Sequence, residues 1–345
     1  MVVFGRRSAI KRCVANLSFT VFLPTFNERG AIERKLENVL NQTAFERYDG
    51  EVLVYDCSTD NTGAILEDYA VRDPRVRLIR QPTRIGVART FNEAIDEARG
   101  DVLVKTDADS LARSHEELAR LLEIFPADNK VGAATGVCAN VAREGAFRTL
   151  MTKLQIAETN LDSTVIAHSS SMIAIRRTAL TRVDPDSMAE DTEEFLRIRR
   201  AGLRTILDPS VVSTERIPSK FSDRFEQKQR RAHGIIRALF QNTDMLFNSR
   251  YRRYGLIVLP INFFLLTVSP FLLLMNVLAL VYLGFTMGVL VGFVVVLTAL
   301  LLLLVSLFRP SSSLAGLVDL QLFALVGFLN FVSGKTNPTW KVHRT

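Results

Sequence analysis

The sequence predicts an α/β protein whose mostly parallel sheet is flanked by helices and followed by apolar helices that reach a membrane. Two features of the chain lead to this fold class. Short apolar runs alternate with amphipathic segments about every 25 residues in the first half of the chain. The composition then changes abruptly, because residues 255–333 contain only two charged side chains, Arg309 and Asp319. The chain therefore divides into a charged, water-soluble part and an apolar part.

The expected strands are short apolar runs that end in polar residues. Such runs are typical of strands that are covered on both faces, as in a parallel sheet between two layers of helices. The run Glu51–Tyr55, for example, is followed directly by Asp56. The expected strands are Leu17–Pro24, Glu51–Tyr55, Val76–Arg80, Asp101–Thr106, Val131–Cys138 and Ser171–Ile175.

The segments between these strands carry a helical period. Apolar side chains recur on one face of Ala31–Asn41, which is typical of a helix that packs on a sheet. Gly202 ends the helix that begins at Asp191, because glycine readily adopts the conformation that follows a helix. The expected helices are Ala31–Asn41, Thr62–Ala70, Val87–Ala98, His115–Phe125, Lys153–Asp162, Asp191–Ala201 and Phe221–Asn242.

The charge and the cysteine content narrow the range of functions. The chain carries a formal net charge of +7, which suits an anionic lipid surface or a phosphorylated substrate. Nucleic acid is not an expected partner, because the basic residues are dispersed and match no nucleic-acid-binding module. The three cysteines, Cys13, Cys57 and Cys138, form no CxxC pair, so we expect reduced thiols in a cytoplasmic domain.

Three apolar segments follow the soluble part: residues 256–283, 289–308 and 314–332. A helix needs roughly 20 residues to cross a bilayer, and the first two segments reach this length without a charged residue. Arginines precede the first segment and Arg309 follows the second, which favours two crossings with both flanks in the cytoplasm. The third segment, which contains Asp319, would then lie in the interface or re-enter. Three full crossings remain the alternative.

Polar clusters follow three of the expected strands. They span Thr25 to Glu28, Asp56 to Asp60, and Asp107 to Asp109. Ligands bind beyond the carboxyl ends of the strands in open sheets of this kind, so we expect the three clusters at one site. Asp107 and Asp109 can share Mg²⁺ or Mn²⁺ with the phosphate oxygens of a substrate. Considered alone, each aspartate cluster is also compatible with a cap of the helix that follows.

Taken in order, these motifs resemble the family 2 glycosyltransferases of the GT-A fold, whose sheet contains a Rossmann-like nucleotide-binding half. The resemblance extends from about Leu17 to His233. It implies a basic N-terminal tail at 1–16, a GT-A domain at 17–215, basic interfacial helices that close the donor site at 216–253 and a membrane region at 254–345. The segments that carry it are Pro24-Thr25-Phe26-Asn27-Glu28, Asp56-Cys57-Ser58-Thr59-Asp60-Asn61-Thr62, Gly86 with Asn92, Asp107-Ala108-Asp109, Ser169-Ser170-Ser171, Glu190-Asp191-Thr192-Glu193 and Gln227-Lys228-Gln229-Arg230.

The resemblance also implies a role for individual residues. Asp191 would be the general base that accepts the proton of the attacking acceptor hydroxyl, in one inverting displacement. Asp109 would bind the metal, and Asp107 would contact both the metal and the donor. The nucleoside, most often uridine in this family, would contact Pro24, Thr25, Asn27, Glu28, Asp56, Arg84 and Asp107. The diphosphate would contact Gln227, Arg230 and Arg231, and the acceptor side would include Ser170, Ser171 and Glu190.

One position departs from the family pattern, because Arg231 stands where the family's Gln-x-x-Arg-Trp motif has tryptophan. That tryptophan lines the acceptor site of polymer-forming relatives, so its absence argues against processive synthesis. We therefore expect a multi-pass protein of the cell membrane that transfers a sugar from a nucleotide-sugar, in the first place a UDP-sugar, to a lipid-linked or cell-envelope glycan acceptor. The catalytic domain would be cytoplasmic. Two alternatives remain: a processive polysaccharide synthase that also translocates its product, and an inactive nucleotide-binding membrane scaffold.

Overall fold

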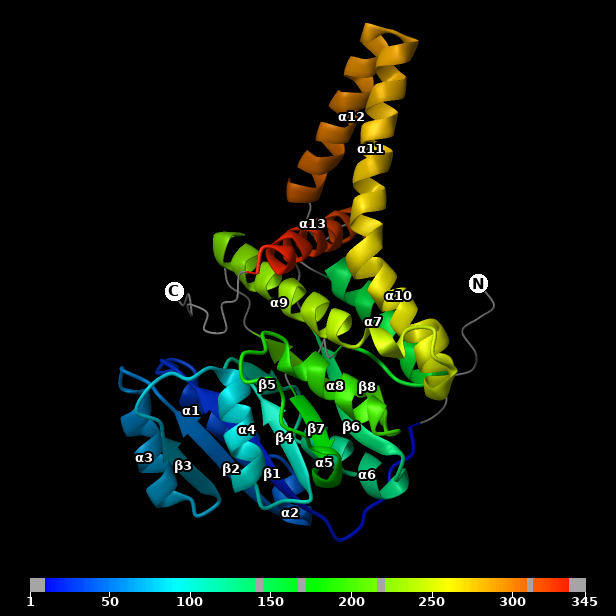
Figure 1. Ribbon diagram of the computed structural model, residues 1–345. Helices are drawn as coiled ribbons and strands as arrows, with labels where there is room; N and C mark the ends of the chain where they lie inside the picture. The colour runs from blue at the N-terminus through cyan, green and yellow to red at the C-terminus, as the bar shows by residue number, and fades with distance from the viewer. Residues whose placement is uncertain (1–9, 140–144, 167–171, 216–220, 309–312, 335–345) are drawn as a thin grey trace.

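The computed structural model describes residues 10–139, 145–166, 172–215, 221–308 and 313–334, and its soluble part is built around one eight-stranded sheet (Figure 1). The strand order is β3-β2-β1-β4-β7-β6-β8-β5. Each strand that the sequence predicts is present, with ends that differ by at most two residues. The strands are β1 (Ser18–Thr25), β2 (Asp49–Asp56), β3 (Val76–Arg80), β4 (Val102–Thr106), β5 (Ser110–Ala112), β6 (Val131–Cys138), β7 (Met172–Arg176) and β8 (Arg204–Glu215).

The half of the sheet that contains β3, β2, β1 and β4 is parallel, as the alternation of strands and helices predicts. β1 is covered on both faces, because Phe19 and Val21 enter one apolar cluster while Phe22 enters the cluster on the other face. Thr25 lies opposite Asp56 in the β1–β2 pair, so the two strands end together at one edge of the sheet. This half has the Rossmann-like arrangement that the sequence predicts.

The other half of the sheet is mixed, which corrects the expectation of a mostly parallel sheet. β7 lies antiparallel between β4 and β6, and β5 lies antiparallel to β8, whereas β6 and β8 are parallel. The sequence pattern misses β5 because this strand has only 3 residues. It misses β8 because Asp208 and Pro209 interrupt the apolar pattern of a buried strand. β8 brings Glu215 opposite Ser110, next to the predicted metal-binding aspartates.

Helices cover both faces of the sheet. The cluster on one face contains residues of α1, α3, α5 and α6, and the cluster on the other face contains residues of α4 and α8. The expected helix His115–Phe125 is divided into two shorter helices, α5 and α6. The helices of the soluble part are α1 (Ile32–Leu40), α2 (Ala44–Arg47), α3 (Thr62–Arg72), α4 (Val87–Glu97), α5 (Glu117–Leu122), α6 (Ile124–Ala127), α7 (Gly145–Leu161), α8 (Glu190–Arg200) and α9 (Phe221–Gln241).

A continuous helical segment, Tyr254–Met287, leads away from the soluble part. It comprises α10 (Leu259–Phe263) and α11 (Ser269–Met287), and a π-helical turn precedes each of them. Pro260 and Pro270 follow these π-helical turns. Proline lacks an N–H donor and its ring crowds the preceding turn of a helix, and the wider π-helical turn accommodates both effects. Within the described ranges, this segment is the one helix that is long and apolar enough to cross a membrane.

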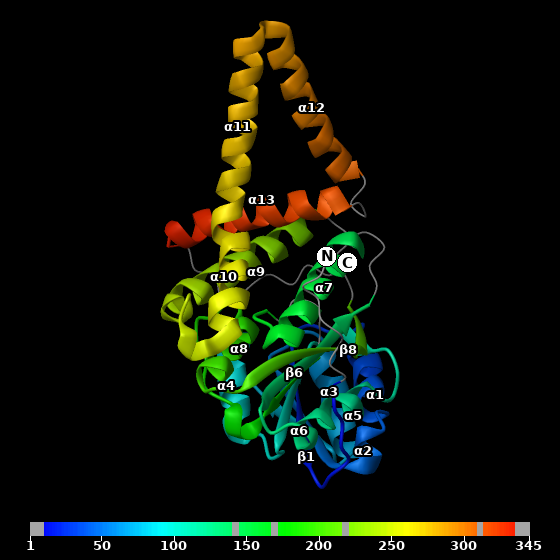
Figure 2. The same ribbon diagram turned by 90° about the vertical axis from the view of Figure 1, so that its right-hand side faces the viewer.

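The other two apolar segments are also helical, but they take different directions (Figures 1 and 2). α12 (Val289–Phe308) runs back alongside α11, while α13 (Ser313–Val332) lies across the direction of α11 and packs on α9. α13 approaches α9 closely, because a Cβ added at Gly327 would lie 2.9 Å from Ala232 Cβ. A membrane crossing by α12 remains a prediction, and a third crossing by α13 remains the alternative.

Candidate active site

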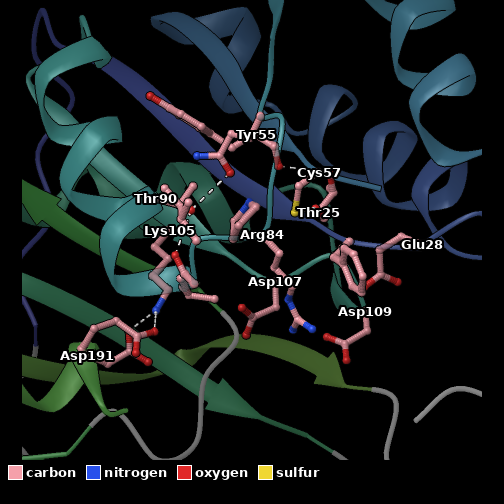
Figure 3. A pocket seen from close by; sticks show the side chains of 18 of the residues that line it. Thr25, Glu28, Tyr55, Cys57, Arg84, Thr90, Lys105, Asp107, Asp109 and Asp191 are labelled. Carbon is pink, nitrogen blue, oxygen red and sulfur yellow. Dashed lines mark hydrogen bonds and ion pairs between the residues drawn. The ribbon is translucent and has the colours of Figure 1, made fainter. Parts of the chain in front are cut away.

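A cleft opens at the carboxyl ends of the parallel strands, where residues of the sheet edge face α8 and α9 (Figure 3). It encloses about 1200 Å³ of empty space, including its open mouth. Most of the residues that the sequence predicts for the site line this cleft, although they come from distant parts of the chain. They are Pro24, Thr25, Glu28, Arg84, Asp107, Asp109, Glu190, Asp191, Gln227, Arg230 and Arg231.

Two of the predicted nucleoside ligands, Asp56 and Asn27, are not among the residues that line the cleft. Asp56 is fully buried and accepts hydrogen bonds from Thr25 Oγ1, at 2.8 Å, and from the guanidinium of Arg80. Asn27 has a φ of 56°, and its Oδ1 accepts a hydrogen bond of 2.9 Å from the N–H of Thr59. In this structure both side chains support the loops behind the wall of the cleft. A direct contact with the nucleoside remains a prediction for both.

One wall of the cleft presents a partly buried guanidinium and an aromatic ring. The Cζ atom of Arg84 lies 4.3 Å from the centroid of the Phe26 ring. Burial lowers the pKa of Arg84, although guanidinium stays charged at any physiological pH. Glu28 is held nearby, because its N–H donates a hydrogen bond of 2.8 Å to Thr62 Oγ1. A planar cation stacked on a ring offers a flat, positively charged surface to a nucleotide.

Asp107 and Asp109 follow directly after β4 and turn toward the cleft (Figure 3). Burial raises the pKa of Asp107, and burial together with the charges of Asp107 and Glu215 raises the pKa of Asp109 to about 7. Neighbouring carboxylates that repel one another are stabilised by a cation. Across the described residues, no three His, Cys, Asp or Glu side chains are placed to hold a metal by themselves. Two neighbouring carboxylates fit Mg²⁺ or Mn²⁺, which take few carboxylates and complete their shell with phosphate oxygens and water.

A buried lysine of α1 supports the turn that carries these aspartates. The Nζ atom of Lys35 donates to Thr106 Oγ1 and to the carbonyl oxygen of Ser110, both at 2.7 Å. Burial lowers the pKa of Lys35 to about 8, against the opposing charges of Asp107 and Asp109. Lys35 therefore fixes the strand end and the following residues on either side of the two carboxylates.

The predicted general base lies in the first turn of α8, where a second buried lysine meets it. Lys105 of β4 donates to Glu190 Oε1 at 2.5 Å and also to Asp191 Oδ1. Burial raises the pKa of Asp191 despite the nearby ammonium. Burial acts in the same direction on Glu190, but the Lys105 ammonium overcomes it and lowers the pKa of Glu190 to about 2. The two neighbouring carboxylates thus differ in proton affinity.

α9 brings the predicted diphosphate ligands Gln227, Arg230 and Arg231 to the cleft. Burial lowers the pKa of Arg230. α9 packs directly on the chain that leads into α8, because a Cβ added at Gly234 would lie 2.7 Å from the carbonyl carbon of Met188. The helix that carries the arginines and the helix that carries the predicted base therefore share a tight contact.

Several residues that line the cleft are not found by sequence reasoning. Lys105 did leave a signal, since a lysine in the apolar run before Asp107 is unusual for a buried strand. No sequence pattern indicates Glu215, because the strand that carries it, β8, is not predicted. The predicted acceptor-side residues Ser170 and Ser171 lie outside the described residues. The additional residues of the cleft include Phe26, Tyr55, Cys57, Gln81, Thr90, Lys105, Ser187 and Glu215.

Comparison with protein-family models defines the class of this protein. Residues 20–183 match the model described as Glycosyl transferase family 2, and residues 104–329 match the one described as Glycosyl transferase family group 2. The protein is an enzyme of the glycosyltransferase class. The chain belongs to glycosyltransferase family 2, which confirms the family that its motifs indicate.

Curated relatives carry related activities. YdaM of Bacillus subtilis, a probable glycosyltransferase, is 23% identical over 79% of this chain and 68% of its own length. An N-acetylglucosaminyltransferase of Mesorhizobium japonicum is 25% identical over 76% of this chain and 65% of its own length. A chondroitin synthase of Escherichia coli is 28% identical over 53% of this chain and 26% of its own length. The chain therefore spans about two thirds or less of these relatives.

A solved structure shares the fold over nearly the whole chain. The mannosyltransferase PcManGT from Pyrobaculum calidifontis, in complex with GDP-Man and Mn²⁺, superposes with a TM-score of 0.81 and 24% sequence identity. The match covers 96% of this chain and 92% of the mannosyltransferase chain. This likeness establishes a GT-A-like fold for the protein.

Proposed function

We propose that this glycosyltransferase moves one sugar from a nucleotide-sugar to a lipid-linked or cell-envelope glycan acceptor, with inversion at the anomeric carbon. The reaction takes place at the cytoplasmic face of the cell membrane. The observation that carries the proposal is the shared cleft, in which Asp107 and Asp109 of the strand edge face Asp191 of α8 and the arginines of α9. An inactive scaffold would have no need for three carboxylates and two guanidinium groups around one cleft, since like charges held close together cost stability.

The donor lies along the ends of β1 and β4 in this proposal. Thr25, Glu28 and Asp107 hold the nucleoside, and the Arg84–Phe26 wall covers it. A uridine nucleotide is expected from the family resemblance. The structural neighbour PcManGT binds GDP-Man, so GDP-mannose is a donor to test beside UDP-sugars.

Asp107 and Asp109 would hold Mg²⁺ or Mn²⁺. The cation would supply positive charge that neutralises the leaving nucleoside diphosphate. Arg230 and Arg231 add charge-assisted hydrogen bonds from the α9 side, because guanidinium groups match phosphate oxygens in a bidentate way. Gln227 lies one turn away on the same helix and contributes an amide donor.

Asp191 acts as the general base. The acceptor hydroxyl oxygen attacks the anomeric carbon, the bond from that carbon to the diphosphate oxygen breaks, and the hydroxyl proton passes to the Asp191 carboxylate. No sugar–enzyme intermediate forms, so the configuration inverts once. General-base catalysis of this kind typically contributes about 10²–10⁴-fold in rate.

The apolar helices support a membrane acceptor. Tyr254–Met287 is the candidate membrane helix, and many side chains of α11 are exposed and apolar, such as Leu278, Leu280 and Leu283. The exposed side chains of Arg250, Arg252 and Arg253 precede this helix and suit the anionic headgroups of a cytoplasmic leaflet. A lipid-linked acceptor would thus be held near the cleft by the same bilayer as the enzyme.

A processive synthase is the second candidate, because a chondroitin synthase and a hyaluronan synthase from Pasteurella multocida each match 53% of this chain at 27% identity. Arg231 argues against a processive synthase. This residue lines the cleft at the position where the resemblance leads us to expect the tryptophan of polymer-forming relatives. Product size separates the two candidates.

The test uses the purified full chain in lipid nanodiscs. It is incubated with radiolabelled UDP-sugars or GDP-mannose and a total lipid extract, with Mn²⁺ or with EDTA. We expect a Mn²⁺-dependent lipid product that is one sugar larger than its acceptor. Asp191→Asn should form this product about 10²–10⁴-fold more slowly, although this variant still binds the donor. A high-mass glycan would support the processive candidate. Absence of both transfer and donor hydrolysis would refute the proposal.

A further inference from the structure

Lys105 occupies an unusual position for a lysine. It lies in β4, opposite Ile173 of β7, and only 6% of its surface is exposed. Its stem lies in a small apolar pocket with Phe91, Ile173 and Phe195. A buried ammonium group costs several kcal/mol unless it is paired and hydrogen-bonded. Packing alone therefore does not account for a lysine at position 105.

The ammonium of Lys105 is shared by two carboxylates. It donates to Glu190 Oε1 and to Asp191 Oδ1, and the three side chains are 7%, 15% and 25% exposed respectively. Both carboxylates belong to the first turn of α8, where the helix dipole also favours negative charge. β4 continues into Asp107, so this ion pair joins the strand of the predicted metal site to the helix of the predicted base.

The contact divides the two oxygens of Asp191. Oδ1 is bound to Lys105, which leaves Oδ2 for the proton of the acceptor hydroxyl. The same ammonium also binds Glu190 Oε1 and offsets part of the negative charge of the two carboxylates. Without it, two adjacent carboxylates would be free to turn away from each other and out of the reacting geometry.

We propose that Lys105 is a positioning residue for sugar transfer, whose ammonium fixes the Asp191 carboxylate in the geometry that accepts the acceptor proton. This inference rests on the proposed role of Asp191 as general base. Lys105 acts through Asp191 and not on the donor, so it should affect the transfer step and leave nucleotide binding unchanged. A misplacement of about 1 Å at a reacting group is enough to lower a rate by roughly 10²-fold.

The first test is the substitution Lys105→Met in the full chain, with Lys130→Met as the matched control, because Lys130 has an exposed side chain in the turn before β6. We expect kcat of Lys105→Met to fall by about 10²–10⁴-fold, the range of a lost general base. The Kd of UDP or GDP with Mn²⁺, whichever nucleotide supports transfer, should change by less than about 3-fold, since guanidinium and metal contacts are intact. Lys105→Arg retains a cation and should recover part of the lost kcat. Lys130→Met should behave as the unmodified chain.

The second test is a double variant. If Lys105 acts through Asp191, then Lys105→Met combined with Asp191→Asn should lose no more activity than Asp191→Asn alone. Additive losses would overturn the inference, as would an unchanged kcat in Lys105→Met. A weakened nucleotide Kd with unchanged kcat would also overturn it, because Lys105 would then bind the donor. If Lys105→Met binds no nucleotide, kcat and nucleotide Kd are measured for Lys105→Gln instead, with the same expected results.

Failure of this inference and failure of the proposed function give different results. If the unmodified chain transfers no sugar, the proposed function fails. If the unmodified chain and Lys105→Met transfer at the same rate, the proposed function stands and only the role of Lys105 is refuted.

Discussion

Glu158 of α7 gives a quantitative test of the contact between the soluble part and the candidate membrane helix. Its side chain is 4% exposed and accepts hydrogen bonds from Asn262 Nδ2 of α10, at 2.5 Å, and from Thr164 Oγ1, at 2.8 Å. Burial raises the pKa of Glu158 from its ordinary value of 4.5 to about 7, although these hydrogen bonds oppose the change. The folded protein therefore holds this proton more tightly than the unfolded chain.

The sign of the pH effect follows from this difference. Between pH 4.5 and pH 7 the folded state binds more protons at Glu158 than the unfolded state does, so stability falls as the pH rises through this window. One pH unit corresponds to 1.36 kcal/mol. The change in the pKa of Glu158 from 4.5 to about 7 thus corresponds to roughly 3 kcal/mol in the free energy of unfolding. This contribution is fully present below pH 4.5 and is lost above pH 7.

The perturbation is Glu158→Gln, which removes the titrating group. Thermal unfolding of the full chain in detergent is followed by circular dichroism from pH 4.5 to pH 8. Relative to the unmodified chain, the variant should gain about 3 kcal/mol, or roughly 5–10 °C in Tm, as the pH rises across this range. Glu37→Gln, which removes an exposed carboxylate of α1, serves as the control and should leave the pH dependence unchanged. Parallel Tm curves for Glu158→Gln and the unmodified chain would refute the reasoning.

Three further predictions concern the cleft. Gly234→Ala should lower kcat by at least about 10-fold, because the added Cβ would lie 2.7 Å from a backbone carbon. Such overpacking costs about 1–3 kcal/mol, which exceeds the roughly 1 kcal/mol that alanine gains in helix propensity. Gly30→Ala, whose added Cβ has nothing within 4 Å, is the control, and equal kcat values for the two variants would refute the close contact. Asp109→Asn should weaken Mn²⁺ binding by at least about 10-fold in the electron paramagnetic resonance signal of free Mn²⁺, and an unchanged affinity would exclude Asp109 as a ligand. Arg231→Ala should raise the donor KM by about 10–100-fold, as expected for a lost charged hydrogen bond of about 1.5–3 kcal/mol, and an unchanged KM would remove it from the diphosphate site.

The parallel half of the sheet can be predicted from the sequence, because short continuous stretches of the chain indicate its strands. Each of its strands is a continuous apolar run, and each functional cluster follows such a run directly, as Asp56 follows β2 and Asp107 follows β4. Parallel strands with short connections bring these ends to one edge, so the convergence of Thr25 and Asp107 on one cleft follows from topology.

The remaining part of the site depends on contacts between distant residues, which no local pattern reports. β8 is broken by Pro209 and has a register shift against β6, so it does not resemble a strand in sequence, yet it supplies Glu215. No local pattern indicates which groups Lys35 and Lys105 bind. Only the fold shows that each ammonium is buried against groups some 70 to 86 positions away in the chain.

α9 connects the apolar helices to the chemistry of the cleft. Its apolar side chains, among them Ile235, Ile236 and Leu239, form one cluster with Leu320 and Ala324 of α13. Its other side contacts the chain before α8 through the close approach at Gly234, while α13 contacts it through the close approach at Gly327. A helix held this tightly from two sides cannot shift without moving the predicted diphosphate arginines relative to the predicted base. The apolar region is therefore tied to the cleft, because removing α13 would uncover the apolar face of α9, which is the helix that brings Gln227, Arg230 and Arg231 to the cleft.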